Sequence, residues 1–356
     1  MRMKYLTHYL LIILFIAFIA LMPIMGVMTP DEEVSLRENR RLNTFPSFSM
    51  TSIEDITLKL DAYFDDHFAF RDKFIDLKEK ISDRISGHKR NRFRAVVGQS
   101  DWAFYEGCVE HYQGRFSEEK IDAFLKDLEH FSNQITVPVL VAVVPNKAYV
   151  YDEYLPDYVQ GSTQRKQTIE KISDINNIHV LDLLPSLKQE SITKQTYMNY
   201  DTHWNGWGAY IAYKEIMNFI NKNITISILA REDIASIEIN DRFEGGIAAM
   251  LGKAGEIYDT NSHVVFSNQS AQEYQKETSV HEGVETLHYK NHKGLGRAII
   301  LHDSFVEAHL GDYFSETFYE TSLYRTFDFV HLVEQIKKEN PDFVLIEIVE
   351  RHIYSD

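Results

Sequence analysis

An aspartate and a histidine stand two residues apart in the segment "YMNYDTHWNGWGAY", residues 197–210. A carboxylate and an imidazole at this spacing suit a catalytic acid–base pair, part of a metal site, or a hydrogen-bonded turn. If Asp201 orients the ring and His203 acts as a base, the chemistry also needs a nucleophile or an activated water. The sequence has no H-E-x-x-H segment and no Cys/His cluster, which disfavours metal ligation, and no G-x-S-x-G elbow.

A second segment, "AIILHDSFVEAHLGDYF" (298–314), offers a nucleophile. An apolar strand is predicted to end near Leu301, and a helix to begin at Ser304 or Phe305. Asp303 is suited to be the N-cap of that helix. Alone, such a serine is usually part of a cap. Together with the first segment it completes a triad in the chain order Asp201, His203, Ser304, with the helix amino end suited to a developing oxyanion. We therefore expect Ser304 to lie within reach of His203.

The elements around these segments predict a three-layer α/β/α fold. Apolar, β-branched runs alternate with helical patterns, as in a mainly parallel five-stranded sheet covered on both faces. In such sheets, sites form at the carboxyl ends of the strands. The predicted strands are 137–145, 177–184, 296–304, 315–324 and 341–350, and the predicted helices are 117–132, 163–175, 206–221, a short one after 304, and 328–339.

One interval, residues 222–295, departs from this alternation. It contains "GGIAAMLGKAG" and period-two stretches, which predict an inserted loop-and-hairpin region beside the sheet. Its four histidines lack the close spacing of metal ligands, so we expect scattered surface imidazoles and no metal site. They are His263, His281, His288 and His292. No cofactor is expected.

The first thirty residues read as a membrane anchor. Residues 5–30 carry no acidic or basic side chain except His8, and about 20 apolar residues suffice to cross a bilayer. Arg2 and Lys4 precede this run and three acidic residues follow it, which places the body of the protein outside the cell. An uncleaved anchor is favoured over a cleaved signal peptide, since no A-x-A-like site follows. The expected organisation is an anchor at 1–30, a lead-in at 31–52 and a catalytic domain at 53–356.

Composition narrows the possible partners. A chain of 356 residues with 44% hydrophobic residues can bury a sizeable core. Its formal net charge of −16 excludes a nucleic-acid binder and fits a neutral or basic polymer or a small acyl donor better. The single cysteine, Cys108, is expected to be a partly buried small hydrophobe, because nothing beside it would activate a thiolate.

The two segments "DTHWNGWGAY" and "LHDSF" resemble those of the DHHW-motif proteins and alginate O-acetyltransferases, a branch of the SGNH hydrolase-like superfamily. Supporting stretches, such as "VVPNKAYVY" and "PDFVLIEIVERHI", extend the resemblance over about residues 35–355. Position 202 is Thr, as in the alginate-transferase form of the block. The resemblance implies acyl transfer at the outer surface of a bacterial cell membrane. Ser304 would carry the acetyl group, His203 would act as base and then acid, and Asp201 would fix the imidazole.

The resemblance also implies partners and further site residues. The acceptor would be an exported polysaccharide, and the donor would be supplied by a multi-spanning membrane O-acyltransferase. An acetyl esterase of surface glycans, or a silent polysaccharide-binding assembly subunit, are the alternatives. Asn146 is the best-placed asparagine for an oxyanion hole, with Lys147 beside it, unless the two only form a turn. Arg351 is a rim candidate or a structural ion-pair partner of a neighbouring Glu, and Trp204 either stacks on sugar or packs the helix start.

Overall fold

The computed structural model falls into two compact units, one of residues 1–93 with 249–252 and one of residues 94–248 with 253–356. Each is described by itself. The residues that the structure describes are 9, 11–13, 15–16, 34–35, 40–46, 53–68, 70–71, 73–74, 77–78, 81, 94–224, 228, 230–278 and 285–354.

The first unit contains two short strands and one long helix among its described residues. Strands β1 (Val34–Ser35) and β2 (Arg40–Arg41) pair antiparallel, and helix α2 spans Ile53–Asp66. The carboxylate of Asp66 accepts hydrogen bonds from the backbone and side chain of Asn43 at 2.8 and 2.7 Å, which ties the helix end to the preceding segment. No helix in the described part of the chain is long and apolar enough to cross a membrane. The predicted anchor, residues 5–30, lies almost wholly outside the described residues.

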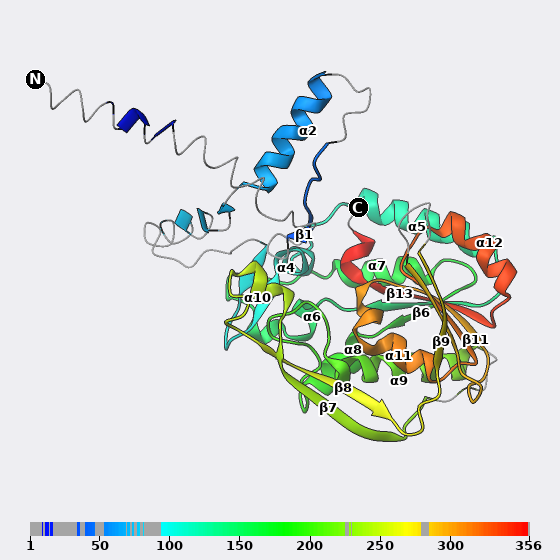
Figure 1. Ribbon diagram of the computed structural model, residues 1–356. Coiled ribbons are helices and arrows are strands. Elements are labelled where there is room, and N and C mark those ends of the chain that lie inside the picture. The colour runs from blue at the N-terminus through cyan, green and yellow to red at the C-terminus, as the bar shows by residue number, and fades with distance from the viewer. Residues whose placement is uncertain are drawn as a thin grey trace, which may run out of the picture. The chain divides into compact units, whose positions relative to one another are not determined.

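The second unit is built on a seven-stranded sheet in the order β6-β5-β13-β11-β12-β10-β9 (Figure 1). The first five strands in this order run parallel, and they are the five predicted from the sequence. Their runs are near-continuous because helices cover both faces, and all seven residues of β13 are buried. These strands are β5 Val139–Val144, β6 Ile178–Asp182, β11 Arg297–Leu301, β12 Glu320–Tyr324 and β13 Phe343–Val349.

The sheet is mixed, which corrects the expected five strands. Strand β10 (Glu285–Lys290) pairs antiparallel with β12, and β9 (Gln272–Thr278) pairs antiparallel with β10. The end of the predicted insertion therefore extends the sheet instead of lying beside it. The burial alternates along β10, as is common in antiparallel strands, because Thr286 and His288 are buried while Leu287 between them is more exposed. The other hairpin, β7 (Ile234–Phe243) with β8 (Asp259–Phe266), forms a two-stranded sheet of its own.

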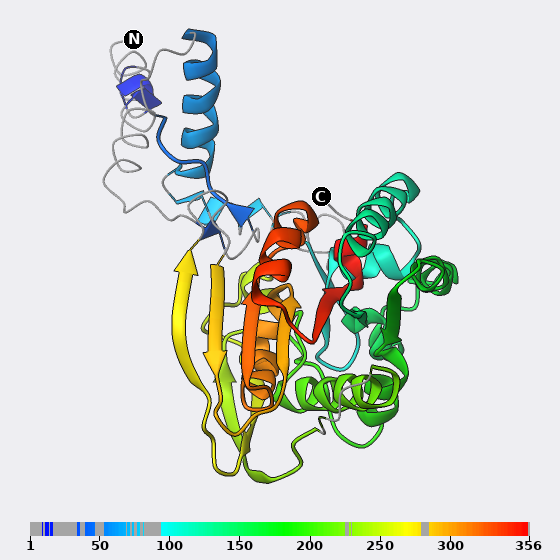
Figure 2. The same cartoon turned by 90° about the vertical axis from the view of Figure 1, so that its right-hand side faces the viewer.

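Two hydrophobic cores lie on opposite faces of the sheet. Along β5, Val139, Val141 and Val143 belong to the core under α5 (Glu118–Ser132), α7 (Gln164–Ser173) and α12 (Phe329–Glu339). Leu140, Ala142 and Val144 belong to the other core, which includes residues of α9 (Gly206–Asn223) and of the hairpin β7–β8. Figure 2 gives a second view of these ribbons. This alternation follows the two-residue period of a strand and shows that both faces of the sheet are covered, as the predicted α/β/α layering requires. Burial of each large side chain in such a core stabilises the fold by about 1.5–3 kcal/mol.

The other strands and the helices after residue 93 have the following bounds. Strands β3 (Ala95–Val97) and β4 (Ala103–Tyr105) form an antiparallel pair. The helices after residue 93 are α4 Glu106–Tyr112, α5 Glu118–Ser132, α6 Lys147–Val150, α7 Gln164–Ser173, α8 Leu184–Ser191, α9 Gly206–Asn223, α10 Gly246–Met250, α11 Gly311–Ser315 and α12 Phe329–Glu339. Short 3-10 turns occur at η1 (Asp152–Tyr154) and η3 (Glu350–Ile353), and a π turn at η2 (Val306–Leu310).

Candidate active site

Asp201, His203 and Ser304 form a continuous hydrogen-bonded chain at the carboxyl edge of the sheet. Nδ1 of His203 lies 2.6 Å from Oδ1 of Asp201, and Nε2 lies 2.8 Å from Oγ of Ser304. The expectation that Ser304 lies within reach of His203 is met. With the Nδ1 proton shared with the carboxylate, the free lone pair of Nε2 faces the hydroxyl, as general-base activation requires.

The carboxylate of Asp201 is held by more than the imidazole. Its Oδ1 also accepts the backbone N–H of His203 at 2.9 Å, and its Oδ2 accepts the N–H of Gly246 at 2.7 Å. Burial alone would raise the pKa of Asp201, but the hydrogen bond and charge of His203, with these backbone donors, hold it well below its ordinary value. Asp201 is therefore ionised at neutral pH and can stabilise an imidazolium.

Lys147 supports the turn that carries Asp201. Its buried ammonium donates to the backbone carbonyls of Met198 at 3.0 Å, Asn199 at 3.0 Å and Asp201 at 2.6 Å. Burial lowers the pKa of Lys147 to about 8, against the raising effect of the Asp259 and Asp201 charges. All three carbonyls belong to the backbone of this chain, so the ammonium is used within the protein. Lys147 is thus a positioning residue.

Asp259, which the sequence reasoning missed, holds the same turn from the hairpin β7–β8. Its carboxylate accepts the backbone N–H groups of Asn199 at 2.8 Å and Tyr200 at 2.9 Å. Burial raises the pKa of Asp259 to about 6, although Lys147 and these two donors oppose the rise. A single polar residue in a period-two stretch gives no signal of this role, because its partners lie some 60 residues away.

Ser304 begins the helical segment after β11, and its side chain is half-buried. Asp303 caps this segment as predicted: its Oδ1 accepts the N–H of Phe305 at 2.9 Å. The other oxygen of Asp303 accepts the N–H of Val349 at 2.8 Å and faces Nδ1 of His352 at 3.1 Å. The serine is therefore fixed to the end of the neighbouring strand β13.

A buried acid lies beneath this turn. One oxygen of Glu347 is 3.3 Å from the backbone nitrogen of Asp303, which donates to it. The other has no hydrogen-bond partner among the described residues. Burial, followed by the negative charge of Asp303, raises the pKa of Glu347 well above its ordinary value and so favours the protonated form of this carboxyl.

Trp204 is buried, with no accessible surface, so its ring is not available to stack on a sugar. The indole Nε1–H donates to the carbonyls of Phe305 and Ala308, both at 3.1 Å. Trp204 thereby joins the segment of His203 to the segment of Ser304. Trp207 also packs against the protein, with its Nε1–H donating to Glu190 at 2.8 Å and the Lys194 ammonium 3.4 Å from its ring centroid.

Asn146 and Arg351 lie together, but they bond to the protein. The buried amide oxygen of Asn146 accepts from Nη1 of Arg351 at 3.1 Å and from the Cys108 thiol at 3.2 Å. Its amide nitrogen is 3.0 Å from Nδ1 of His111. Both ends of the Asn146 amide are thus engaged by other side chains of the protein. Cys108 is buried as expected, and burial raises the pKa of its thiol.

Arg351 also contacts the segment that begins at Ser304. Its guanidinium lies 5.3 Å from the ring centroid of Phe305, the residue after Ser304. The neighbouring acid, Glu350, pairs instead with Arg165, another residue that the sequence reasoning missed. Asn146 also donates its backbone N–H to Glu350 at 2.6 Å. Of the predicted rim residues, Arg351 is half-buried and Asn146 and Lys147 are buried.

The sequence matches one family model and two curated relatives. The model, described as an SGNH hydrolase-like domain, acetyltransferase AlgX, matches residues 95–284, just over half of the chain. These residues include Asp201 and His203 and end before Ser304. A probable alginate O-acetylase AlgJ of Pseudomonas putida is 24% identical over 139 residues, 36% of this chain and 34% of the relative. That of Azotobacter vinelandii is 22% identical over 170 residues, 46% of this chain and 43% of the relative. The chain thus aligns with less than half the length of each.

Solved structures share the fold. A DHHW family protein from Eubacterium siraeum superposes with a TM-score of 0.56 at 17% identity, covering 74% of this chain and 95% of that one. Bacillus cereus PatB1 gives a TM-score of 0.56 at 17% identity, covering 74% and 97%. At such identities the likeness concerns the arrangement of helices and strands, and that arrangement is SGNH-like.

Proposed function

Since this chain belongs to the family of SGNH hydrolase-like, AlgX-type acetyltransferase domains, we propose that it O-acetylates hydroxyls of a polysaccharide through an acetyl-serine intermediate. The observation that carries the proposal is the hydrogen-bonded chain from Asp201 through His203 to Ser304, with separations of 2.6 and 2.8 Å. It supplies a nucleophile, a base and an orienting carboxylate in one place.

In the first half-reaction, Oγ of Ser304 attacks the carbonyl carbon of an acetyl ester while Nε2 of His203 takes the hydroxyl proton. The tetrahedral oxyanion forms beside the amino end of the helical segment that begins at Ser304, where the partial positive charge favours it. Its collapse breaks the bond to the leaving oxygen, which takes the proton from His203. Asp201 stabilises the imidazolium between these steps.

In the second half-reaction, an acceptor hydroxyl attacks the acetyl-serine and gives its proton to His203. Collapse of the second intermediate breaks the bond to Oγ, the proton returns to Ser304, and the acetylated acceptor leaves. Atoms and charges balance without a cofactor. The imidazole of His203 must carry the proton in both half-reactions, and its contact with Oγ of Ser304 at 2.8 Å places it for this role.

The acceptor, donor and location are part of the same proposal. The curated relatives are described as alginate O-acetylases, which supports a polysaccharide acceptor. The net charge of −16 favours a neutral or basic polymer over a polyanion. The donor would be a multi-spanning membrane O-acyltransferase, and the chain would be anchored by residues 5–30 with the triad outside the bacterial membrane.

An acetyl esterase is the second candidate, since the same triad transfers acetyl groups to water wherever water reaches the intermediate. The half-buried Ser304 favours this candidate more than a sealed site would. A silent binding subunit is disfavoured, because the three side chains keep catalytic distances that a binding surface does not need.

The test uses the full chain, purified in mild detergent, with an acetyl ester and with or without a neutral oligosaccharide. Ser304→Ala removes the nucleophile. Ser117→Ala is a matched control, because Ser117 also precedes a helix, is half-buried and makes no capping hydrogen bond. Acetylated oligosaccharide that depends on Ser304 but not Ser117 supports transfer. Acetate release alone supports the esterase, and no turnover by the unaltered protein refutes both.

A further inference from the structure

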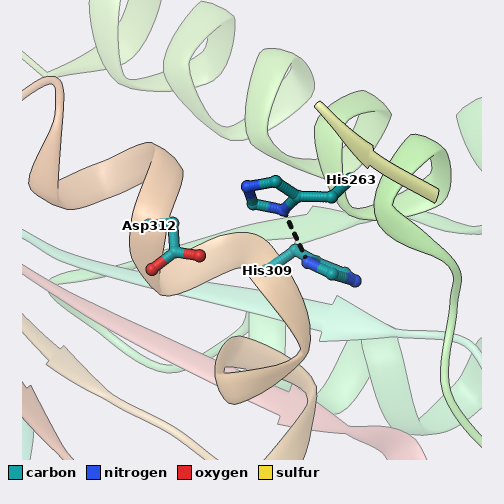
Figure 3. A group of neighbouring side chains, drawn as sticks. All are labelled: His263, His309 and Asp312. Carbon is teal, nitrogen blue, oxygen red and sulfur yellow. Dashed lines mark hydrogen bonds between the residues drawn. The ribbon is translucent and has the colours of Figure 1, made fainter. Parts of the chain in front are cut away.

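Three potential metal ligands gather outside the triad. His263 on β8, His309 in the π turn η2 and Asp312 on α11 each offer one ligand atom, and these atoms lie within 4.8 Å of one another. Figure 3 shows the two imidazoles facing each other, with the carboxylate of Asp312 on the same helical segment as His309. We propose that His263, His309 and Asp312 bind a divalent transition-metal ion, with zinc as the expected occupant. This proposal does not depend on the acetyl-transfer function.

The spacing of the two imidazoles suits a shared ion. Nδ1 of His263 lies 2.8 Å from Nδ1 of His309, so the two nitrogens share one proton. Two histidines on one tetrahedral zinc, with Zn–N bonds of about 2.0–2.1 Å, place their nitrogens about 3.3 Å apart. Small ring rotations that move the two nitrogens about half an ångström further apart would therefore let an ion replace the shared proton. Two nitrogens and one carboxylate oxygen are a ligand set typical of zinc, and a fourth position would be left for water.

His309 is prepared for ligation in two ways. Its Nε2 faces the amide of Asn261, with the amide oxygen at 3.4 Å and the amide nitrogen at 3.1 Å. When Nε2–H donates to that oxygen, Nδ1 carries a lone pair, as a metal ligand requires. The same Nδ1 lies 2.8 Å from Nδ1 of His263, so its lone pair is directed toward the second proposed ligand.

The backbone supports the same arrangement. His309 has φ of 82° and ψ of −30°, a left-handed conformation in a non-glycine residue, and it interrupts the helical segment after Ser304. Such conformations persist where the surrounding structure requires them and gather at functional sites. The kink points the ring toward β8. A bound ion would connect the hairpin β7–β8 to the segment that carries Ser304, and would therefore brace one side of the active site.

The sequence does not predict this site, because His309 and Asp312 lie outside the interval 222–295 that contains His263. His263 needs two ligands from the segment after Ser304, about fifty residues further on. His288 is not a surface imidazole either, since it is buried and its Nδ1 lies 2.9 Å from Oγ of Ser322. His292 is exposed as expected, and His281 lies outside the described residues.

Calorimetric titration of the full chain in mild detergent with ZnCl₂ tests the site. We expect one zinc per chain, and at least about 100-fold weaker binding in His263→Asn and in Asp312→Asn, since loss of a ligand should exceed the effect of losing a supporting partner. His292→Asn is the matched control and should bind as the unaltered protein does. Titration with Co²⁺ adds a spectroscopic readout, with intense visible bands expected for four-coordinate geometry.

Circular dichroism without metal distinguishes the loss of a ligand from the loss of the fold. The two ligand variants should retain the spectrum of the unaltered protein, because neither side chain belongs to the hydrophobic cores. Stoichiometric binding that both variants lose establishes the site. Absence of stoichiometric binding by the unaltered protein, or binding that both variants retain, overturns it and leaves the two imidazoles as a hydrogen-bonded pair.

Discussion

The buried ammonium of Lys147 should make folding stability depend on pH in a direction that one substitution can reveal. Its pKa is about 8 in the folded protein, against an ordinary value of 10.5. The folded state therefore releases this proton more easily than the unfolded state does. Unfolding then takes up a proton between pH 8 and 10.5, and the stability contributed through Lys147 rises with pH across this window. The two pKa values correspond to about 3 kcal/mol in total.

Lys147→Met isolates this effect, because Met has a similar length and does not titrate. Urea unfolding of both proteins from pH 7 to 10.5 gives the difference in unfolding free energy at each pH. We expect this difference to be flat below pH 8 and to shift by about 3 kcal/mol in favour of the unaltered protein by pH 10.5. Lys171→Met, at a half-exposed surface ion pair with Asp122, is the control and should show no such shift.

The result that refutes the reasoning is a difference that stays flat, or moves against the unaltered protein, as pH rises from 8 to 10.5. Either outcome would mean that the three carbonyls of Met198, Asn199 and Asp201 stabilise the ammonium enough to offset its burial. The substitution also removes three donors to the turn of Asp201. The rate of acetyl-ester cleavage should therefore fall in Lys147→Met even at pH 7.

Three further substitutions test the site. Asp201→Asn should lower kcat for acetyl-ester cleavage by about 10⁴-fold while circular dichroism stays unchanged, because the amide no longer favours the reactive tautomer; a loss below tenfold would contradict the triad. Trp204→Phe removes the one N–H that donates to two carbonyls, and it should lower the free energy of unfolding in urea by about 1–3 kcal/mol. An unchanged unfolding midpoint would mean that these hydrogen bonds add no stability. Glu347→Gln should raise the free energy of unfolding at pH 7, because folding favours the protonated form of Glu347 whereas Gln needs no proton. Burial first, and then Asp303, raise the pKa of Glu347, so the stability of the unaltered protein falls as pH rises above the ordinary value of 4.5 and through the folded pKa. Gln should abolish this fall in urea unfolding, and a fall that persists in Glu347→Gln would contradict the assignment.

Patterns that depend on neighbours in the sequence predicted much of the fold. The five parallel strands were recognisable because burial on both faces leaves an unbroken apolar run, as in β5 and β13. The antiparallel strands β9 and β10 were not placed in the sheet, because alternation reveals a half-buried strand without revealing its partner. Short segments also predicted the meeting of His203 and Ser304, since strand ends and helix starts converge at one edge of such a sheet.

The supporting residues were predicted less well, because their roles depend on distant partners. Lys147 bonds to carbonyls more than fifty residues away, and carbonyls carry no sequence signal. The ring of Trp204 could equally have faced solvent, and its N–H meets the carbonyl of Ala308 at a kink that no residue type there predicts. Composition identifies which side chains can do chemistry, whereas long-range packing decides which of them reach the site.

The two halves of the triad are held by separate sets of contacts, and this bears on the choice between transfer and hydrolysis. Lys147 and Asp259 fix the turn of Asp201, while Asp303 fixes Ser304 against β13. The three side chains are therefore aligned before any acceptor binds. An acceptor thus cannot control the reaction by bringing these side chains together. Water at the half-buried Ser304 would then compete for the acetyl-serine in every turnover. Selectivity for a sugar hydroxyl must come from how the acceptor occupies the rim and displaces that water. A transferase of this design should release some acetate even at saturating acceptor.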